Sequence, residues 1–505
     1  MKHLIPLASL IILLACAKPI PEEQISSPNI ILFMVDDMGW QDTSVPFWNQ
    51  VTEFNKRYHT LNMERLALEG MKFTQAYATA VCSPTRVSLL TGMNAARHRV
   101  TNWTLQPDQL KPMETNHDVF EFPMWNVNGI SPDSSLPHSV YASPLPMVLR
   151  SHGYATIHVG KAHFGAIDTP GANPLNLGFD VNIAGHAAGA PKSYYGTENF
   201  GNTPEFEGTP WPVPGLEEYH GEDIYLTDAL TNEALEALEH VDKPFFLYMS
   251  YYAVHTPIMA NHKYFNKYLE TGLDSIEARY ATMIETMDNS VGRFLDYLQQ
   301  RQLDSNTVIL FMSDNGGLSA IARGGEPHTH NRPLSSGKGS IYEGGIREPM
   351  LVKWPGVVEP GSQSNNYLII EDFYPTILEI AGIQNFLPVQ IIDGISFLPV
   401  LQGKSPSNPS RPLFWHFPNE WGPTGPGIGA YSAVRLDGWK LIYYHHDGSY
   451  ELFNIDNDIS EAVNLSTDEP EKREELAVIL SNYLVSVDAQ MPTYLESGAP
   501  VPYPQ

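Results

Sequence analysis

Short, unbroken apolar segments recur along the chain and are separated by amphipathic stretches. The apolar segments are rich in Ile, Val, Leu and Phe and cover residues 29–35, 155–159, 245–250, 307–312 and 349–353. A continuous apolar run is typical of a strand covered on both faces, as in a parallel sheet flanked by helices. Residues 225–240 and 275–300 instead space their apolar side chains as on one face of a helix. This alternation predicts a doubly wound α/β domain.

The pattern changes after about residue 400. The segment SPSNPSRP, residues 405–412, has the composition of a linker. Beyond it, Asp437-Gly438 predicts a hairpin, YELFNI a further strand, and residues 469–487 a helix. We therefore predict a main α/β domain over residues 28–404 and an α+β subdomain over 405–505. The subdomain is expected to be a small antiparallel sheet with a terminal helix, packed on the main domain.

Polar residues stand at the ends of four of the apolar segments. In chain order they are Asp36 and Asp37, then Lys161 and His163, then His255, and last Asp314 and Asn315. Open α/β sheets bind ligands beyond the carboxyl ends of their strands. One such group alone is equally well explained as a solvated loop or a capped turn. Four segments that bring polar groups to one edge favour a functional site.

The N-terminus predicts an export signal. A basic start precedes an apolar stretch over residues 4–14, which is too short to span a bilayer. Its ending, Leu-Leu-Ala-Cys, resembles a bacterial lipobox, in which the cysteine becomes the lipidated first residue. We therefore predict a signal peptide over residues 1–15, a lipidated Cys16, a linker over 16–27 and an exported lipoprotein, expected in the outer membrane. The alternative is a plain secretory signal in which Cys16 is incidental.

The amino-acid composition limits the classes of partner that the chain can bind. Its 57 Asp and Glu against 30 Lys and Arg give a formal net charge of −27, which argues against nucleic acid as a partner. A site for an anionic substrate would have to be locally positive. Once Cys16 is lipidated or removed, Cys82 is the one thiol left, so no internal disulfide can form.

Cys82 lies at the predicted start of a helix. Ser83 suits the N-cap, Pro84 the first helical position and Gly92 the end of the helix. The thiol would sit just outside a helix N-terminus, where free N–H groups and Arg86 attract anions. Reactive thiols with a low pKa are common at such positions in enzymes. A buried, inert cysteine is the alternative.

The longer string CSPTRVSLLTG, residues 82–92, resembles the signature of type I sulfatases, C-x-P-x-R-x-x-L-L-T-G. Further segments resemble the motifs of that family in its order: ILFMVDDMGW, GKAHFG with Ala162 where an aromatic residue is often seen, VHTP, MSDNGG, SGKGSIYEGGIREPMLVKWPG and the closing YELFNIDNDISEAVNL. The resemblance covers nearly the whole mature chain. It implies an alkaline-phosphatase-like α/β sandwich, with a large mixed, mostly parallel sheet flanked by helices and a small C-terminal antiparallel sheet with a helix.

The resemblance also implies a modified residue and a metal ion. In that family a dedicated formylglycine-generating or anaerobic sulfatase-maturating enzyme oxidises the cysteine to formylglycine (3-oxoalanine), so Cys82 would be the precursor of the nucleophile. A Ca²⁺ ion, or else Mg²⁺, would be bound by Asp36, Asp37, Asp314, Asn315 and the modified Cys82. An anionic, all-oxygen set suits such a hard cation. Phosphohydrolases of the same superfold typically carry His at the position of Asn315 and use zinc pairs.

The remaining roles follow from the same resemblance. Lys161 and Lys338 would spread the charge that grows on the sulfate, together with the metal ion. His255 would protonate the departing sugar oxygen. His163 would take the proton of the second hydroxyl, so that the aldehyde re-forms and sulfate leaves. Arg86 would orient the formylglycine.

We therefore expect a sulfatase acting on a sulfated oligo- or polysaccharide, of an algal type such as ulvan or carrageenan. The alternatives are a phosphate or phosphonate ester hydrolase of the same superfamily, and a non-catalytic glycan-binding lipoprotein with an unmodified Cys82. Residues 104–146, 185–221 and 323–333 predict long lids or binding loops. Candidates for sugar contacts in and beside them, with ordinary loop packing as the alternative, are Trp103, His186, Tyr194, His328, His330 and Arg332.

Overall fold

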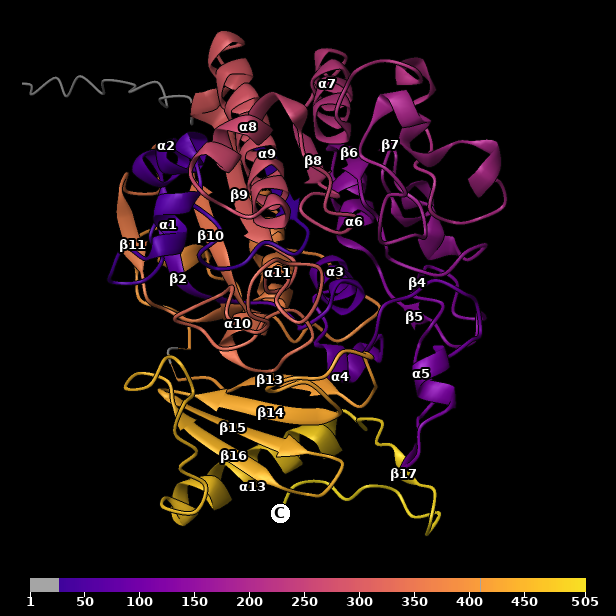
Figure 1. The fold of residues 1–505 in the computed structure, drawn as a ribbon, viewed down its shortest axis with the longest axis vertical. Helices are drawn as coiled ribbons and strands as arrows, with labels where there is room; N and C mark the ends of the chain where they lie inside the picture. Colours follow the sequence, from indigo (N-terminus) through magenta and orange to yellow (C-terminus); the bar gives the residue numbers. More distant parts are fainter. Residues whose placement is uncertain (1–26, 409) are drawn as a thin grey trace, which may run out of the picture.

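The computed structural model describes residues 27–408 and 410–505. The predicted signal peptide (1–15), the predicted lipidation site Cys16 and all but the last residue of the predicted linker (16–27) lie outside the described residues. Within the described part, no helix is both long enough and apolar enough to cross a membrane. A large sheet between layers of helices and a smaller sheet at one end make up the fold (Figure 1).

Nine described strands form the large sheet, in the order β11-β2-β10-β9-β1-β8-β6-β7, with β12 also paired to β2. The adjacent strands β9, β1, β8, β6 and β7 are parallel, whereas β10 is antiparallel to both of its neighbours. The predicted mixed, mostly parallel sheet is therefore confirmed. Its strands are β1 (Asn29–Val35), β2 (Met71–Tyr77), β6 (Ala155–Gly160), β7 (Val181–Ile183), β8 (Phe245–Ser250), β9 (Thr307–Ser313), β10 (Arg347–Lys353), β11 (Ser362–Ser364) and β12 (Leu368–Ile369).

The central strand β1 is buried on both faces, as its unbroken apolar sequence predicts. Alternate residues enter two different cores: Ile30 packs with helices α3, α6 and α11, and Ile31 packs with α2, α7 and α9 on the other side. The apolar run at residues 349–353 is a strand as predicted, but such a run reports burial on two faces and not strand direction. That run lies in the antiparallel β10.

Thirteen α-helices lie in the described chain, and two of them coincide with the amphipathic stretches predicted at 225–240 and 275–300. The helices are α1 (Glu53–Arg57), α2 (Leu61–Glu69), α3 (Cys82–Thr91), α4 (Ala95–His98), α5 (Pro112–Thr115), α6 (Leu145–Ser151), α7 (Leu226–Glu239), α8 (His262–Glu270), α9 (Ser275–Gln300), α10 (Glu343–Ile346), α11 (Phe373–Ile380), α12 (Leu398–Leu401) and α13 (Pro470–Ser486). Short 3₁₀ helices are η1 (Pro170–Ala172), η2 (Pro174–Leu177), η3 (Gly196–Gly201), η4 (Pro204–Phe206), η5 (Glu217–Tyr219), η6 (Asp304–Asn306) and η7 (Ile370–Asp372).

The helix at Cys82 differs from the prediction at its start. Helix α3 begins at Cys82 itself, not at Pro84, and no side chain caps it. The hydroxyl of Ser83, the predicted cap, instead donates to the carbonyl oxygen of His163 at 3.2 Å. A tertiary hydrogen bond thus replaces the local capping preference. Gly92 ends the helix in the left-handed region, with φ of 69°, as predicted.

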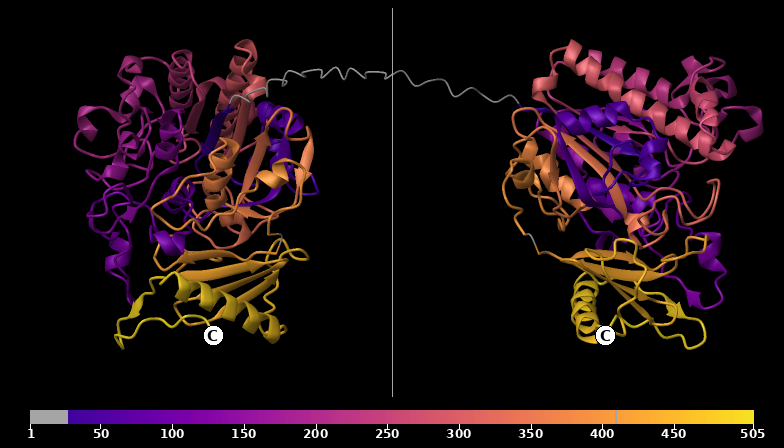
Figure 2. Two further views of the ribbon diagram at one scale, coloured as in Figure 1. Left: turned by 180° about the vertical axis from the view of Figure 1, so that it is seen from behind. Right: turned by 60° about the vertical axis from the view of Figure 1, so that its left-hand side comes forward.

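The C-terminal residues form the predicted antiparallel sheet and helix. Its strands, in spatial order, are β13 (Leu413–Phe417), β14 (Tyr431–Leu436), β15 (Trp439–Tyr444) and β16 (Tyr450–Asn454), and the predicted hairpin joins β14 to β15. One face, with Trp415 and Ile442, packs into a core of the main domain. The other face, with Leu441, packs against Leu480 of α13, and Figure 2 shows this helix on the outer side of the small sheet.

Two further strand pairs join segments of the loops. Strand β17 lies next to β3, which ties the C-terminal segment to the loop after α5. Strands β4 and β5 pair within the long segment between α5 and α6. The four short strands are β3 (Phe120–Glu121), β4 (Ile130–Ser131), β5 (Val140–Tyr141) and β17 (Thr493–Tyr494).

Candidate active site

The carboxyl ends of four neighbouring parallel strands meet at one edge of the large sheet. Strands β9, β1, β8 and β6 are adjacent in that order, so the residues that follow them lie side by side. The side chains brought together there are Asp36, Asp37, Lys161, His163, His255, Asp314 and Asn315. Helix α3 adds Cys82 and Arg86, and the segment after β9 adds Lys338.

Two lysines pair with the two aspartates that follow β1. The Nζ atom of Lys161 lies 2.6 Å from Asp36 Oδ2, and that of Lys338 lies 2.6 Å from Asp37 Oδ1. The side chains of Asp36, Asp37 and Lys161 are fully buried. Because a buried charge is costly without a partner, each pair stabilises the ionised form of both of its members.

Arg86 connects helix α3 to three strand ends. Its Nε donates to Asp314 Oδ2 at 2.9 Å, and its Nη1 donates to Ser250 Oγ at 2.6 Å and to the carbonyl oxygen of Lys161 at 3.1 Å. The other carboxylate oxygen of Asp314 accepts from the backbone N–H of Asp37 at 3.2 Å. Since Arg86 and Asp314 are both fully buried, this arrangement fixes the position of the helix that carries Cys82.

Three buried oxygens at the site lack a hydrogen-bond partner: Oδ1 of Asp36, Oδ2 of Asp37 and Oδ1 of Asn315. The amide nitrogen of Asn315 donates to Asp37 Oδ1 at 2.8 Å. Ligand atoms of Asp36, Asp37 and His255 lie within 4.8 Å of one another. Carboxylate and amide oxygens are the ligands that Ca²⁺ and Mg²⁺ prefer, so the residues present fit a hard divalent cation.

Burial and charge act differently on the two aspartates. Burial raises the pKa of Asp36 well above its usual value, and repulsion from Asp314 adds to the effect more than attraction to Lys161 offsets it. Burial also opposes the charged form of Asp37, but the nearby cationic groups together outweigh it and hold the pKa of Asp37 below its usual value. Lys338 contributes most to this lowering, and His255 and Lys161 add to it. The two neighbouring carboxyls are therefore not equivalent.

Cys82 faces His163 on the floor of the site. Its Sγ lies 3.3 Å from His163 Nδ1, and His163 Nε2 lies 2.9 Å from the carbonyl oxygen of Thr104. A carbonyl only accepts, so Nε2 is the donor and Nδ1 of the neutral imidazole is the acceptor that faces residue 82. Burial lowers the pKa of His163 well below its usual value and raises the pKa of the Cys82 thiol. Cys82 is thus a neutral thiol, and the helix start does not make it a thiolate.

His255 is held by its own loop. Its Nδ1 lies 2.9 Å from the carbonyl oxygen of Thr256 and is therefore the donor, which leaves Nε2 as the acceptor, 3.7 Å from Asp37 Oδ2. The buried hydroxyl of Tyr194 donates to the carbonyl oxygen of His255 at 2.9 Å. Burial and Lys338 lower the pKa of His255 to about 3. His255 Nε2 and Asp37 Oδ2 are thus both acceptors. They repel each other unless a proton or a cation lies between them.

The backbone is strained at two positions in the site. Asp37 has φ of 60° and His163 has φ of 57°, both in the left-handed region that side chains other than glycine rarely adopt. Such residues cluster at functional sites, where the surrounding structure holds them in place. Here Asp37 lies two residues after the end of β1, and His163 lies three residues after the end of β6.

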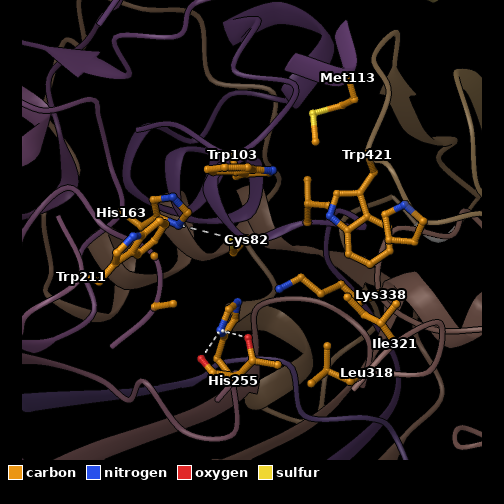
Figure 3. A pocket seen from close by; sticks show the side chains of 15 residues that line it. Cys82, Trp103, Met113, His163, Trp211, His255, Leu318, Ile321, Lys338 and Trp421 are labelled. Atoms are coloured by element: carbon orange, nitrogen blue, oxygen red, sulfur yellow. Dashed lines mark hydrogen bonds between the residues drawn. The ribbon is translucent and has the colours of Figure 1, made fainter. Parts of the chain in front are cut away.

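A cavity of about 340 Å³ opens above Cys82 (Figure 3). Cys82, His163, His255 and Lys338 lie at its floor and sides, whereas the other site residues lie beneath it. Its remaining lining is mostly apolar and comprises Val81, Trp103, Met113, Gly189, Ala190, Trp211, Thr256, Leu318, Ile321, Trp421 and Pro423.

Of the six loop residues predicted as sugar contacts, the cavity lining includes only Trp103. The other five pack elsewhere or lie outside the lining: His186 contacts Tyr252 and Pro210, Tyr194 supports His255, His328 contacts Ser336, His330 contacts Ser319 and Gly324, and Arg332 is exposed. Sequence reasoning missed Trp211 and Trp421, which stand in segments without periodicity. A tryptophan in a long irregular loop was the one available signal.

Comparison with known proteins matches most of the chain. A family model described as Sulfatase matches residues 28–383, and one described as N-sulphoglucosamine sulphohydrolase, C-terminal, matches residues 337–490. A protein named Sulfatase from Formosa agariphila is 31% identical over 530 residues, with 95% of this chain and 92% of the relative covered. The N-acetylgalactosamine-6-sulfatase of Homo sapiens is also 31% identical, with 90% of this chain and 84% of the relative covered.

Solved structures share the fold. The crystal structure of Ps i-CgsB in complex with k-i-k-neocarrahexaose superposes with a TM-score of 0.69 at 26% sequence identity. The similarity covers 91% of this chain and 93% of that one.

Proposed function

Because this chain belongs to the sulfatase family, whose members are sulfuric ester hydrolases, we propose that it removes sulfate from a carbohydrate through a formylglycine made from Cys82. The alkaline-phosphatase-like fold expected from the sequence is confirmed. The observation that carries the proposal is the position of Cys82, whose Sγ lies 3.3 Å from the acceptor nitrogen of His163 on the floor of the cavity. A neutral thiol in that place suits a precursor better than a nucleophile.

A divalent cation, proposed as Ca²⁺, would be held by the unpartnered oxygens of Asp36, Asp37 and Asn315. When bound, it would supply positive charge that stabilises the sulfate oxygens during transfer. The charges of the side chains at the site give the reason for such a cation. Three cationic side chains face three carboxylates, namely Arg86, Lys161 and Lys338 against Asp36, Asp37 and Asp314. When all three carboxylates are ionised and no further cation is bound, these charges cancel, although an anion must bind there.

The side chains divide the proton transfers between them. Hydrated formylglycine at residue 82 would supply two hydroxyl groups, one for attack on sulfur and one for the release of sulfate. His163 presents an acceptor nitrogen to residue 82 and would take the proton of the second group. His255 lines the cavity, and once its Nε2 has taken up a proton from solvent it would protonate the departing sugar oxygen. Lys338, in the cavity lining, and the fully buried Lys161 would stabilise the negative charge that develops.

The proposed substrate is a sulfated galactose-type glycan, such as an algal galactan. The support comes from two similar proteins, of which one is an N-acetylgalactosamine-6-sulfatase and the other was crystallised with a neocarrahexaose. Ulvan is a further candidate, and a sulfated carbohydrate of either kind would be met outside the cytoplasm.

We propose in addition that the chain is exported and anchored through a lipid on Cys16. Strand β1 begins at Asn29, at the edge of the sheet opposite to the site that follows Val35. An anchor before β1 would therefore attach at the end of the main domain remote from the cavity. Metabolic labelling with palmitate should mark the wild type in its native host and not a Cys16→Ser variant, and equal labelling would contradict the proposal.

The modification of residue 82 is tested by mass spectrometry of protein from the native host. Trypsin releases residues 73–86 as one peptide, whose mass should show the loss expected when the CH₂SH group becomes an aldehyde. The Cys82→Ala variant should fold and lose turnover. An unconverted thiol in an active preparation would overturn the proposed chemistry.

Relative hydrolysis rates distinguish the proposed sulfatase from the alternative, a phosphate or phosphonate ester hydrolase. The kcat/KM for 4-nitrophenyl sulfate should exceed that for 4-nitrophenyl phosphate with the same preparation and metal ion. A clear preference for phosphate would replace sulfate hydrolysis as the proposed activity.

A further inference from the structure

Three tryptophans surround the space above Cys82, and each comes from a different loop. Trp103 follows α4, Trp211 lies between η4 and η5, and Trp421 lies between β13 and β14. Figure 3 shows their rings on different sides of that space, with His255 and Lys338 below. Flat aromatic faces pack well against the C–H faces of a sugar ring, because both surfaces are apolar and rigid.

The same cavity lining offers no further cation to a second anionic group on the bound sugar. Among the described residues that line the cavity, the ones that can carry charge are Cys82, His163, His255 and Lys338. All four belong to the reaction site, and Lys338 is already paired with Asp37 at 2.6 Å. A sulfate or carboxylate elsewhere on the bound sugar would therefore lose its water and gain no cation.

From these two observations, and on the basis of the function proposed above, we propose that Trp103, Trp211 and Trp421 form an aromatic clamp. The clamp holds the sugar ring that carries the reactive sulfate by stacking. It thereby selects a ring with one sulfate and no other charge over the same ring with a second sulfate or a carboxylate.

Glu114 is the positioning residue of this clamp. Its buried carboxylate accepts from Asn102 Nδ2 at 3.0 Å, from Asn419 Nδ2 at 2.8 Å and from Trp125 Nε1 at 3.2 Å. Asn102 and Asn419 precede Trp103 and Trp421 by one and two residues, and Asn102 also donates to the carbonyl oxygen of residue 420. One carboxylate thus ties together the loops that carry two of the three tryptophans.

Two further contacts hold the rings in place. The ammonium of Lys111, a residue only 5% exposed, lies 3.8 Å from the ring centroid of Trp103. Trp421 lies directly on Gly339, where a Cβ atom would come 2.0 Å from the ring. Gly339 is the next residue after Lys338. The ring of Trp421 therefore packs on the same backbone turn that carries the site lysine.

The charge preference is tested with methyl β-D-galactopyranosides that carry one sulfate at each position in turn, together with their disulfated counterparts. The enzyme is first shown to contain formylglycine and metal. For the position that it hydrolyses, kcat/KM should be at least about tenfold higher for the monosulfate than for disulfates that include that position. Equal or higher values for the disulfates would overturn the clamp proposal. Hydrolysis of no member would instead count against the proposed function.

Variants of Trp421 test the stacking. Trp421→Ala should raise KM about tenfold and leave kcat within about threefold, and Trp421→Phe should recover most of the loss because it keeps an aromatic face. Formylglycine content and the melting temperature report whether each variant is folded and modified. Unchanged KM in a folded, modified Trp421→Ala protein would contradict a stacking role.

Two more variants separate positioning from simple folding. Glu114→Gln replaces one acceptor with a donor and should raise KM more than it lowers kcat, whereas a purely structural role would lower the melting temperature and leave KM unchanged. Ile321→Lys places a cation on a half-exposed lining position, 52% exposed. It should raise the relative rate on the disulfates, and no change in that ratio would count against the charge argument.

Discussion

The ammonium of Lys338 lies between Asp37 and the cavity, where it can contact both the carboxylate and a bound sulfate. Lys338→Ala removes the charge that we propose stabilises the transition state, and it should lower kcat/KM by about 10²- to 10³-fold. Steady-state rates on the best monosulfated substrate measure the effect, with Lys404→Ala, an exposed lysine remote from the site, as the matched control. A loss of less than about threefold would exclude Lys338 from charge stabilisation.

The unpartnered oxygens of Asp36, Asp37 and Asn315 predict that the proposed metal ion would stabilise the fold when it binds. Metal-free protein should gain thermal stability when Ca²⁺ is added, by about 2.7 kcal/mol at a hundred times the dissociation constant. Calorimetry with and without chelator measures the gain, and Asp37→Asn should largely remove it. An identical gain in that variant would mean that the ion binds elsewhere.

Single residues also show which parts of the site could be predicted from the sequence. Asp36, Asp37, Asp314 and Asn315 were predictable because each follows a strand whose apolar run marks its end. Glu114 was not predictable, since it lies in a four-residue helix within an irregular segment, and its side-chain donors are 11 to 305 residues away. Its importance comes from burial and from its donors, which only the folded chain brings together.

At the scale of elements, the segment from β9 to β10 forms one wall of the cavity, and Arg323 anchors it. The buried guanidinium donates to both carboxylate oxygens of Glu277 on α9, at 2.6 and 2.7 Å, and stacks on Tyr280 at 3.6 Å. The same segment carries Leu318 and Ile321 of the lining. The wall is therefore held to helix α9 by one ion pair and one ring.

Loss of this anchor should be costly. Arg323→Ala leaves Glu277 with one cationic partner, Arg57, and should destabilise the protein by about 3 to 5 kcal/mol. Hydrogen exchange should increase over residues 318–336, and KM should rise because the wall loosens. Arg332→Ala changes an exposed arginine in the same segment and should shift stability by no more than about 0.5 kcal/mol. Equal effects of the two variants would refute the anchoring role.

The elements themselves were mostly predictable, and the reason is burial. Strands β1 and β8 are apolar apart from Asn29 and Ser250 because helices cover both of their faces, so their bounds coincide with the predicted ones. Strand β7 is three residues long and partly exposed, and β2 mixes polar with apolar residues, so neither gives a continuous run. The direction of β10 depends on the connection through the cavity wall, which has no local signal.

At the scale of the whole molecule, the acidic chain must attract an acidic substrate. The formal net charge of −27 repels a sulfated glycan at long range, and screening at physiological salt confines that repulsion to about 8 Å. Association should therefore become faster as salt rises, until competition for the site sets in. Stopped-flow binding to the Cys82→Ala variant, using Trp fluorescence at increasing NaCl, measures this. A rate that falls steadily with salt would indicate a positive steering surface instead.

Two buried histidines of the small sheet, His416 and His445, belong to a hydrogen-bonded chain that affects the stability of the protein in acid. His445 Nε2 lies 2.9 Å from Ser432 Oγ, which lies 2.8 Å from His416 Nδ1, and His416 Nε2 lies 2.8 Å from the carbonyl oxygen of Gln490. With both rings neutral these contacts are satisfied: His416 Nε2 donates to Gln490, Ser432 Oγ donates to His416 Nδ1, and His445 Nε2 donates to Ser432. Burial accordingly lowers the pKa of His416 to about 4 and the pKa of His445 well below its usual value.

The sign of the pH dependence follows from these values. The unfolded chain binds a proton at each histidine near pH 6.5, whereas the folded chain does not, so stability is lost as the pH falls from 6.5 toward 4. His416 alone should account for about 2 kcal/mol between pH 7 and pH 5. Urea unfolding at the two pH values measures the loss, and His416→Gln, which cannot take up the proton, should reduce it. An equally steep loss in that variant would place the acid sensitivity in other groups, because the hydrogen-bonded chain through Ser432 would then contribute nothing to it.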